Sequence, residues 1–161
     1  MSTYRFGTLC AGAFGLCVVA LPLAVQADTD ACTLLTPAQV GAAVGVSVSQ
    51  GQHVTPTFVK TCTWTASGSA NVKFVTLNLQ PAESFEGGKQ MASQMAALSK
   101  GGAVEPAGVG EDSYYFVAGD QVGLLVKKGS IAFKVAVYAI LPVKNKEAME
   151  LNLAKEVLAK L

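Results

Sequence analysis

Few residue types in this sequence could support catalysis or metal binding. His53 is the one histidine of the chain, and none of its neighbours in sequence is an evident partner for it. Catalysis by histidine needs a nucleophile and an orienting group that meet in space, and sequence spacing does not show such a meeting. Glu111 and Asp112 are adjacent carboxylates, but adjacent side chains point apart on most backbones and acidic residues are common in turns. The sequence therefore predicts no catalytic residue, no metal ligand and no cofactor.

Cysteines provide the clearest covalent prediction. The chain contains 4 cysteines, and Cys10 and Cys17 fall in an N-terminal segment that we expect to be removed. Cys32 and Cys62 then remain, and an even pair in an exported domain is most simply a disulfide. The alternative is a redox or metal pair, which lacks a closely spaced second cysteine and would have His53 as its single histidine. We predict a Cys32–Cys62 disulfide.

Aromatic residues supply the candidate binding surface. Tyr114-Tyr115-Phe116 is the densest aromatic cluster, and it follows the turn Gly108-Val109-Gly110. That turn is not a phosphate-binding loop, because a strand and not a helix follows it. In a strand, Tyr114 and Phe116 share one face and Tyr115 takes the other, so one tyrosine should be exposed. Tyr114 or Tyr115, with Tyr138 and Lys134 of the last strand, are the predicted binding residues.

The N-terminal residues predict where the protein works. Arg5 precedes an apolar run from Leu9 to Val25, and Val25-Gln26-Ala27 offers a cleavage site. We therefore expect a signal peptide over residues 1–27 and a mature chain that begins at Asp28. The expected location is the periplasm or the medium.

Two alternatives to a cleaved signal fit the sequence less well. An uncleaved anchor needs roughly 20 apolar residues, and this run has about 17, with Pro22 near its end. A lipid anchor needs a small residue directly before the modified cysteine, whereas leucine precedes both Cys10 and Cys17. We expect no membrane attachment after cleavage.

Charge excludes two classes of partner. The chain has 12 Lys plus Arg and 11 Asp plus Glu, and loss of Arg5 with the signal leaves a net charge near zero. A basic stripe, which nucleic-acid binding needs, is missing, and so is a lysine-rich amphipathic segment for anionic lipid. The expected partner is an unknown protein or small molecule, and the oligomeric state stays open.

Hydrophobic periodicity predicts six strands and three helices. The strands are expected at Val46–Gln50, Lys60–Ala66, Val72–Gln80, Ser113–Val117, Val122–Lys127 and Ile131–Ala139. The helices are expected at Pro37–Val44, Ser84–Leu98 and Lys144–Lys160. Residues 51–57 are expected to form a loop and residues 101–110 a long irregular link. In the second helix Met91 and Met95 are predicted to pack in the core.

These elements predict an α+β fold in a single domain, residues 28–161. Its antiparallel sheet of about six strands would carry about three helices and one disulfide. The last strand alternates Phe133, Val135 and Val137 with Lys134 and Tyr138, a pattern typical of a sheet with one buried face. The final helix has a wide apolar arc and should lie across that face.

Three local patterns together resemble a known group. They are Cys32-Thr33-Leu34-Leu35-Thr36, Cys62-Thr63-Trp64, and Gly108-Val109-Gly110-Glu111-Asp112-Ser113-Tyr114-Tyr115. They resemble the small exported domains of unknown function found in actinobacterial lipoproteins, in which a cysteine before the first helix pairs with a cysteine just before a tryptophan. The resemblance implies an α+β domain with no established enzyme activity and no catalytic residues. Because the lipid-bearing cysteine is missing here, tethering to a membrane does not carry over.

Two classes of function follow from the sequence. The first is a non-enzymatic exported domain that binds a partner protein or small ligand through a sheet face or edge. The second is a periplasmic hydrolase-like enzyme whose site is built from scattered residues near His53, such as Glu111 and Asp112. The scarcity of catalytic residue types favours the first.

Overall fold

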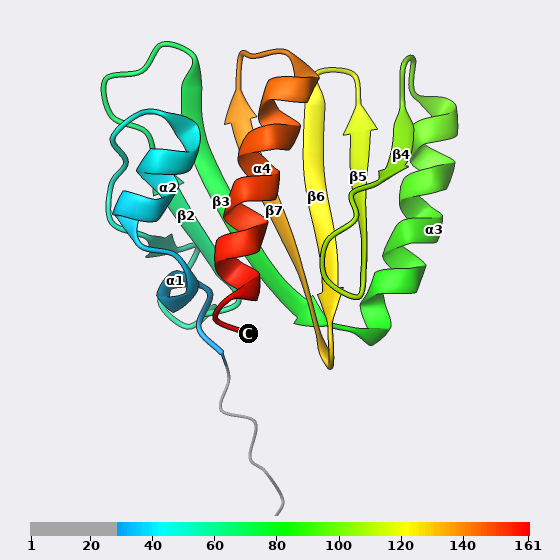
Figure 1. Ribbon diagram of the computed structural model, residues 1–161, viewed down its shortest axis with the longest axis horizontal. Helices are drawn as coiled ribbons and strands as arrows, with labels where there is room; N and C mark the ends of the chain where they lie inside the picture. Colours follow the sequence, from blue (N-terminus) through cyan, green and yellow to red (C-terminus); the bar gives the residue numbers. More distant parts are fainter. Residues whose placement is uncertain (1–28) are drawn as a thin grey trace, which may run out of the picture.

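The computed structural model describes residues 29–161, and the predicted signal peptide, with Cys10 and Cys17, lies outside them. The described chain has an α+β fold built on one antiparallel sheet of seven strands in the order β1-β2-β3-β7-β6-β5-β4 (Figure 1). Four helices pack on this sheet. Within residues 29–161, no helix is both long and apolar enough to cross a membrane.

The elements follow the predicted order, with three short additions and without the strand predicted at Val46–Gln50. The strands are β1 (Gln52–His53), β2 (Thr61–Thr65), β3 (Val72–Pro81), β4 (Ala103–Pro106), β5 (Asp112–Ala118), β6 (Gln121–Lys128) and β7 (Ile131–Ala139). The helices are α1 (Ala31–Leu34), α2 (Pro37–Val44), α3 (Glu83–Leu98) and α4 (Val143–Leu158). α1, β1 and β4 were not expected from the sequence.

Local signals set both ends of α2. The Thr36 hydroxyl accepts a hydrogen bond from the Gln39 backbone N–H, and the Gln39 side chain accepts one from the Thr36 N–H. This capping box satisfies N–H groups that a helix start would otherwise leave unpaired. Gly45 ends the helix at a φ of 74°, a left-handed conformation that glycine adopts at little cost.

The two faces of the sheet are covered unequally. Alternate residues of β5, β6 and β7 (Tyr115, Leu124 and Phe133 among them) join the main core beneath α1, α2 and α4. The intervening residues Tyr114, Leu125 and Ala132 form a second, smaller core with Phe85 and Ala92 of α3. The helix α3 therefore covers the opposite face, but only toward its β4 edge (Figure 1).

This arrangement corrects the predicted exposure of the tyrosines. Tyr114 and Tyr115 are 1% and 7% exposed, because β5 is one of the strands with helices on both sides. The Tyr114 ring packs edge-on against Phe85 of α3, with centroids 5.2 Å apart. The Tyr115 hydroxyl donates to the Glu147 backbone carbonyl of α4 at 3.1 Å. Neither side chain is an exposed binding residue.

The predicted core role of Met91 and Met95 is also wrong. The two side chains are 62% and 50% exposed. The face of α3 that packs on the sheet carries Ala92 and Ala96 instead, one position further along the helix and so about 100° around it. Small alanines let the helix backbone lie close to the sheet.

Two further segments differ from the prediction, namely the strand expected at residues 46–50 and the irregular link expected at residues 101–110. Residues 46–50 form only one isolated bridge, Val48 with Ala66, because the Ser49 hydroxyl takes the Thr65 N–H and interrupts the ladder. The predicted link contains β4, which pairs with β5 as an edge strand. Its last residue, Pro106, has no N–H to donate and therefore suits a sheet edge.

β6 and β7 separate at one end, and α4 fills the space between them. Their pairing ends at Leu124 with Val135, and the strands diverge beyond it behind α4 (Figure 1). The Glu150 carboxylate accepts the Val137 N–H at 2.9 Å. The Lys146 ammonium donates to the backbone carbonyls of Asp120 and Ala139. Both side chains are buried, so polar side-chain groups of α4 replace the missing part of the ladder.

Candidate functional site

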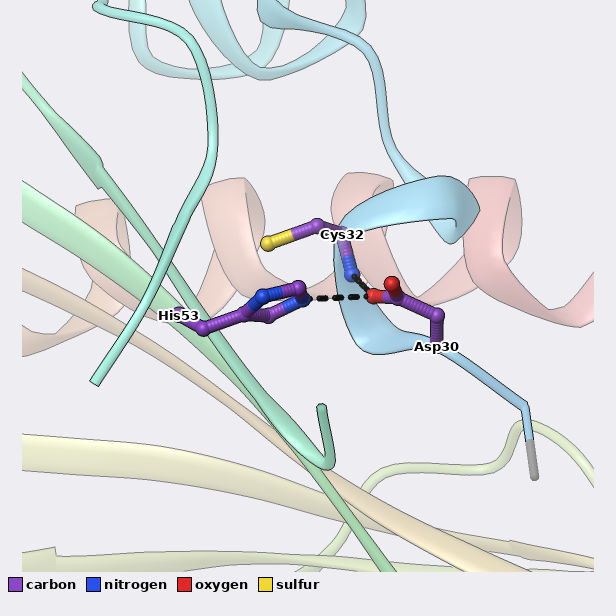
Figure 2. Close-up of side chains that lie close together, drawn as sticks. All are labelled: Asp30, Cys32 and His53. Carbon is purple, nitrogen blue, oxygen red and sulfur yellow. Dashed lines mark hydrogen bonds and ion pairs between the residues drawn. The ribbon is translucent and has the colours of Figure 1, made fainter. Parts of the chain in front are cut away.

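His53 has a partner that the sequence did not reveal. Its Nε2 lies 2.8 Å from Asp30 Oδ1 (Figure 2), and the side chains of His53 and Asp30 are 23% and 33% exposed. Asp30 is the N-cap of α1, where the same oxygen accepts the Cys32 N–H at 2.7 Å. His53 is held in β1, directly opposite Cys62 of β2. Two short elements thus fix an imidazole against a carboxylate.

Hydrogen bonds favour the charged form of the Asp30 carboxyl. The contact with His53 is the largest influence, and it lowers the pKa of Asp30 below its usual range. Partial burial opposes this shift, while the Cys32 N–H adds to it. Asp30 can hold the His53 ring in one orientation, or the two side chains can present an oxygen and a nitrogen to a metal ion.

Cys32 is the third member of this cluster. Ligand atoms of Asp30, Cys32 and His53 all lie within 4.8 Å of one another. The predicted disulfide is confirmed, since Cys32 is bonded to Cys62 with the Cα atoms 5.0 Å apart. A disulfide sulfur is a poor metal ligand and is not a nucleophile, because the thiolate is the form of cysteine that binds metals and acts as a nucleophile. In the oxidised protein this cluster therefore offers a metal ion only Asp30 and His53.

A second candidate site lies on the side of the sheet opposite α4. This surface over β2, β3 and β7 is here called the open face, because the helices of the described chain leave most of it uncovered, although α3 contacts β3. Its side chains are Thr61, Thr63, Thr65, Phe74, Thr76, Asn78, Lys134, Ala136 and Tyr138. Most of them are half-buried, as expected of an uncovered sheet. The predicted binding residues Tyr138 and Lys134 both belong to it.

The open face carries one aromatic pair toward one end and polar or small side chains along the rest. Tyr138 stacks on Phe74 with ring centroids 4.2 Å apart. Beside this pair, Thr63, Thr76 and Ala136 lie opposite one another on three successive strands. The Asn78 amide donates to the Thr61 hydroxyl. The surface thus combines an apolar ring pair with hydroxyl and amide groups.

Lys134 adds positive charge next to the separation of β6 and β7. Its aliphatic chain lies over Gly123, where a Cβ atom would be 2.6 Å from Lys134 Cε. Glu150 lies on the α4 side of the sheet. Burial raises the pKa of Glu150 to about 8, although Lys134 and Lys146 favour its charged form. A buried carboxyl close to a half-buried lysine is a feature that no sequence pattern indicated.

The other predicted carboxylates do not form a site. Glu111 and Asp112 point apart, since Glu111 accepts the Gly129 N–H at 2.9 Å while Asp112 pairs with Lys89 at 2.9 Å. The hydrogen bond from Lys89 lowers the pKa of Asp112. A shallow hollow lies along α2 and the segment that follows it, lined by residues between Pro37 and Val48, and it does not include His53.

Three residues of these sites were missed in the sequence. Asp30 could have been found as an N-cap, because an aspartate directly precedes Ala31 at the start of α1. Phe74 could have been noticed as an aromatic on the polar side of an alternating strand. Glu150 carried no signal, since glutamate on a helix is ordinarily solvent-exposed.

Comparison with protein-family models, with curated proteins and with solved structures gave no match for this chain.

Proposed function

We propose that this chain is an exported, non-enzymatic domain that binds a partner protein through the open face. The observation that carries the proposal is the uneven cover of the sheet, in which the helices of residues 29–161 leave most of β2, β3 and β7 uncovered opposite α4. A solvated sheet face carries mainly polar side chains, and this one also carries the stacked pair Phe74–Tyr138. Aromatic residues within a polar surround are typical of protein interfaces.

The shape of the surface favours a protein over a small molecule. Small ligands are bound in concave sites that enclose most of their area, whereas three adjacent strands present a broad, gently twisted surface. Lys134 lies opposite Asn78, four residues along β7 from Tyr138, and would meet an acidic group of the partner. Its aliphatic chain packs on Gly123, which limits the freedom that the side chain would lose on binding.

Site-specific cross-linking in the host tests this proposal. A photoreactive residue at Thr76, in the middle of the open face, should give one discrete cross-linked species. The same residue at Lys155, which is exposed on α4, is the matched control and should give none. Adding Lys134→Glu to the Thr76 variant should reduce the product. No product at position 76, or equal products at both positions, would argue against a protein partner on this face.

Export is the second part of the proposal. It is supported by the Cys32–Cys62 disulfide, because disulfides persist in oxidising compartments, and by the apolar N-terminal run. The resemblance to exported actinobacterial domains agrees with it. The intact mass of the protein from its host should correspond to a chain that begins at Asp28. A species that retains Met1 and sediments with the membrane would contradict export and cleavage.

A hydrolase-like enzyme near His53 is the alternative. The 2.8 Å contact between His53 and Asp30 favours it, since an acidic partner orients a catalytic imidazole. The sulfur beside this pair is not a nucleophile, because Cys32 is bonded to Cys62. Turnover of chromogenic esters by the oxidised protein, abolished by His53→Ala, would promote this alternative over binding.

A further inference from the structure

We propose that reduction of the Cys32–Cys62 disulfide opens a four-ligand zinc site formed by Asp30, Cys32, His53 and Cys62. A dithiol reductant would supply two electrons and two protons and would itself be oxidised to a disulfide. Cys32 and Cys62 would thereby become thiols. Zn²⁺ would then displace the two thiol protons and bind both thiolates, the His53 Nε2 atom and one Asp30 oxygen. Two thiolates, one imidazole and one carboxylate are all ligand types that tetrahedral zinc accepts.

The distances among three of the four ligands suit such a site. Zinc–ligand bonds of about 2.0 to 2.3 Å place neighbouring ligand atoms of a tetrahedron roughly 3.3 to 3.8 Å apart. The ligand atoms of Asp30, Cys32 and His53 already lie within 4.8 Å of one another. Cys62 Sγ is bonded to Cys32 Sγ but is not one of the atoms that all lie within 4.8 Å of one another. Reduction must therefore let the Cys62 side chain rotate away from Cys32 Sγ and toward Asp30 and His53 to complete the site.

Hydrogen bonds, and not only the disulfide, hold the backbone around the ligands. His53 and Cys62 are directly opposite in the β1–β2 ladder, and Asp30 and Cys32 are joined by the N-cap hydrogen bond of α1. That bond also orients the carboxylate, as outer hydrogen bonds do around zinc ligands. Cys62 is fully buried, whereas Asp30 and His53 are partly exposed, so an ion could reach the site from their side.

Trp64 provides an independent indication of thiolate chemistry. Its indole Nε1 is buried and has no hydrogen-bond partner within residues 29–161, although such groups are ordinarily satisfied. A Cβ on Gly51 would be 2.8 Å from this nitrogen and 2.6 Å from Cys62 Sγ. The indole nitrogen and the Cys62 sulfur therefore both lie close to this position at Gly51. A disulfide sulfur is a weak acceptor, but a thiolate accepts an N–H readily. The unpaired donor of Trp64 therefore suits the reduced state.

Cobalt titration of the reduced protein tests the site. The protein is reduced with a phosphine under anaerobic conditions and titrated with Co²⁺. Thiolate-to-cobalt charge-transfer bands and tetrahedral d–d bands should appear at one equivalent, and Zn²⁺ should abolish them while about two protons are released per ion. Trp64 is the one tryptophan of the chain, so quenching of its fluorescence by Co²⁺ should follow the same titration. The oxidised protein should show none of these changes.

Matched variants separate this site from adventitious binding by thiols. His53→Ala and Asp30→Asn should each weaken affinity at least about tenfold, because removal of even an outer partner costs 10- to 100-fold. Asp112→Asn, which removes a carboxylate of similar exposure, should leave it unchanged. Near-ultraviolet circular dichroism of each oxidised variant establishes that it is folded.

Three results would overturn the proposal. The first is a reduced protein that gives no cobalt spectrum. The second is a spectrum that His53→Ala and Asp30→Asn leave unchanged, which would show binding by the thiols alone. The third is a reduced protein that unfolds and that Zn²⁺ does not refold.

Discussion

Glu150 shows how a single residue can link stability to pH. The side chain is fully buried, and one of its oxygens, Oε2, has no hydrogen-bond partner among the described residues. Burial is the main reason why the pKa of Glu150 rises from 4.5 to about 8, and the charge of Glu147 adds to the shift. The folded state therefore holds this proton more tightly than the unfolded chain does. The stability that Glu150 contributes is complete below pH 4.5 and is lost as the pH rises toward 8.

Glu150→Gln should remove this part of the pH dependence. Glutamine keeps an oxygen for the Val137 N–H but carries no titrating proton. We expect the variant to gain stability relative to the wild type between about pH 5 and pH 8, on the order of a few kcal/mol, at about 1.4 kcal/mol per pKa unit. Urea unfolding across this range gives the difference. Glu156→Gln, an exposed glutamate of the same helix, is the control, and parallel curves for wild type and Glu150→Gln would contradict the prediction.

At the scale of an element, substitutions at two glycines test how α3 is placed in the fold. A Cβ on Gly102 would lie 2.3 Å from the Ala96 carbonyl oxygen, whereas a Cβ on Gly87 would meet nothing within 4 Å. We expect Gly102→Ala to destabilise the protein by about 1 to 3 kcal/mol, because the backbone must shift. Gly87→Ala, in the exposed interior of α3, should stabilise it by about 0.5 to 1 kcal/mol. Urea unfolding of both variants checks the pair, and a neutral Gly102→Ala would contradict the close approach.

Elements with local signals could be predicted from the sequence, and elements that depend on distant contacts could not. α2 carries a capping box and a terminal glycine, so its bounds were predicted. α1 has only four residues and is too short to form by itself. It is held by the Cys32 disulfide and by the Ala31 N–H, which donates to the Val59 carbonyl.

The same reasoning explains which site residues were found. Lys134 and Tyr138 lie in a long alternating strand, so their face could be predicted, and the structure places both on the open face. Tyr114 and Tyr115 were expected to divide between a buried and an exposed face. Tyr115 lies in the main core on the α4 side, whereas the position of α3 over β5 decides the burial of Tyr114, and no residue of β5 itself indicates where α3 will pack.

At the scale of the whole molecule, the oxidised protein should be independent of metal. With Cys32 bonded to Cys62, the cluster beside His53 retains two ligands, fewer than zinc sites in proteins use. Metal analysis of the purified oxidised protein should find substoichiometric zinc, copper and iron. A chelator should leave its thermal midpoint unchanged. A stoichiometric metal, or a fall of several degrees, would contradict the prediction and favour an enzyme.

The disulfide should stabilise the whole fold and not only α1. It joins residues 30 positions apart, and closing a loop of this size restricts the unfolded chain by an amount worth about 3.7 kcal/mol at most. Because Cys62 lies in β2, next to the central strands of the sheet, its loss should be felt in global unfolding. Replacing both Cys32 and Cys62 with serine should lower the free energy of unfolding by about 2 to 4 kcal/mol in urea. The amides of α1 should also exchange faster with solvent, since its four residues lose their covalent anchor. Fast exchange in α1 with an unchanged unfolding midpoint would show instead that the disulfide acts only locally.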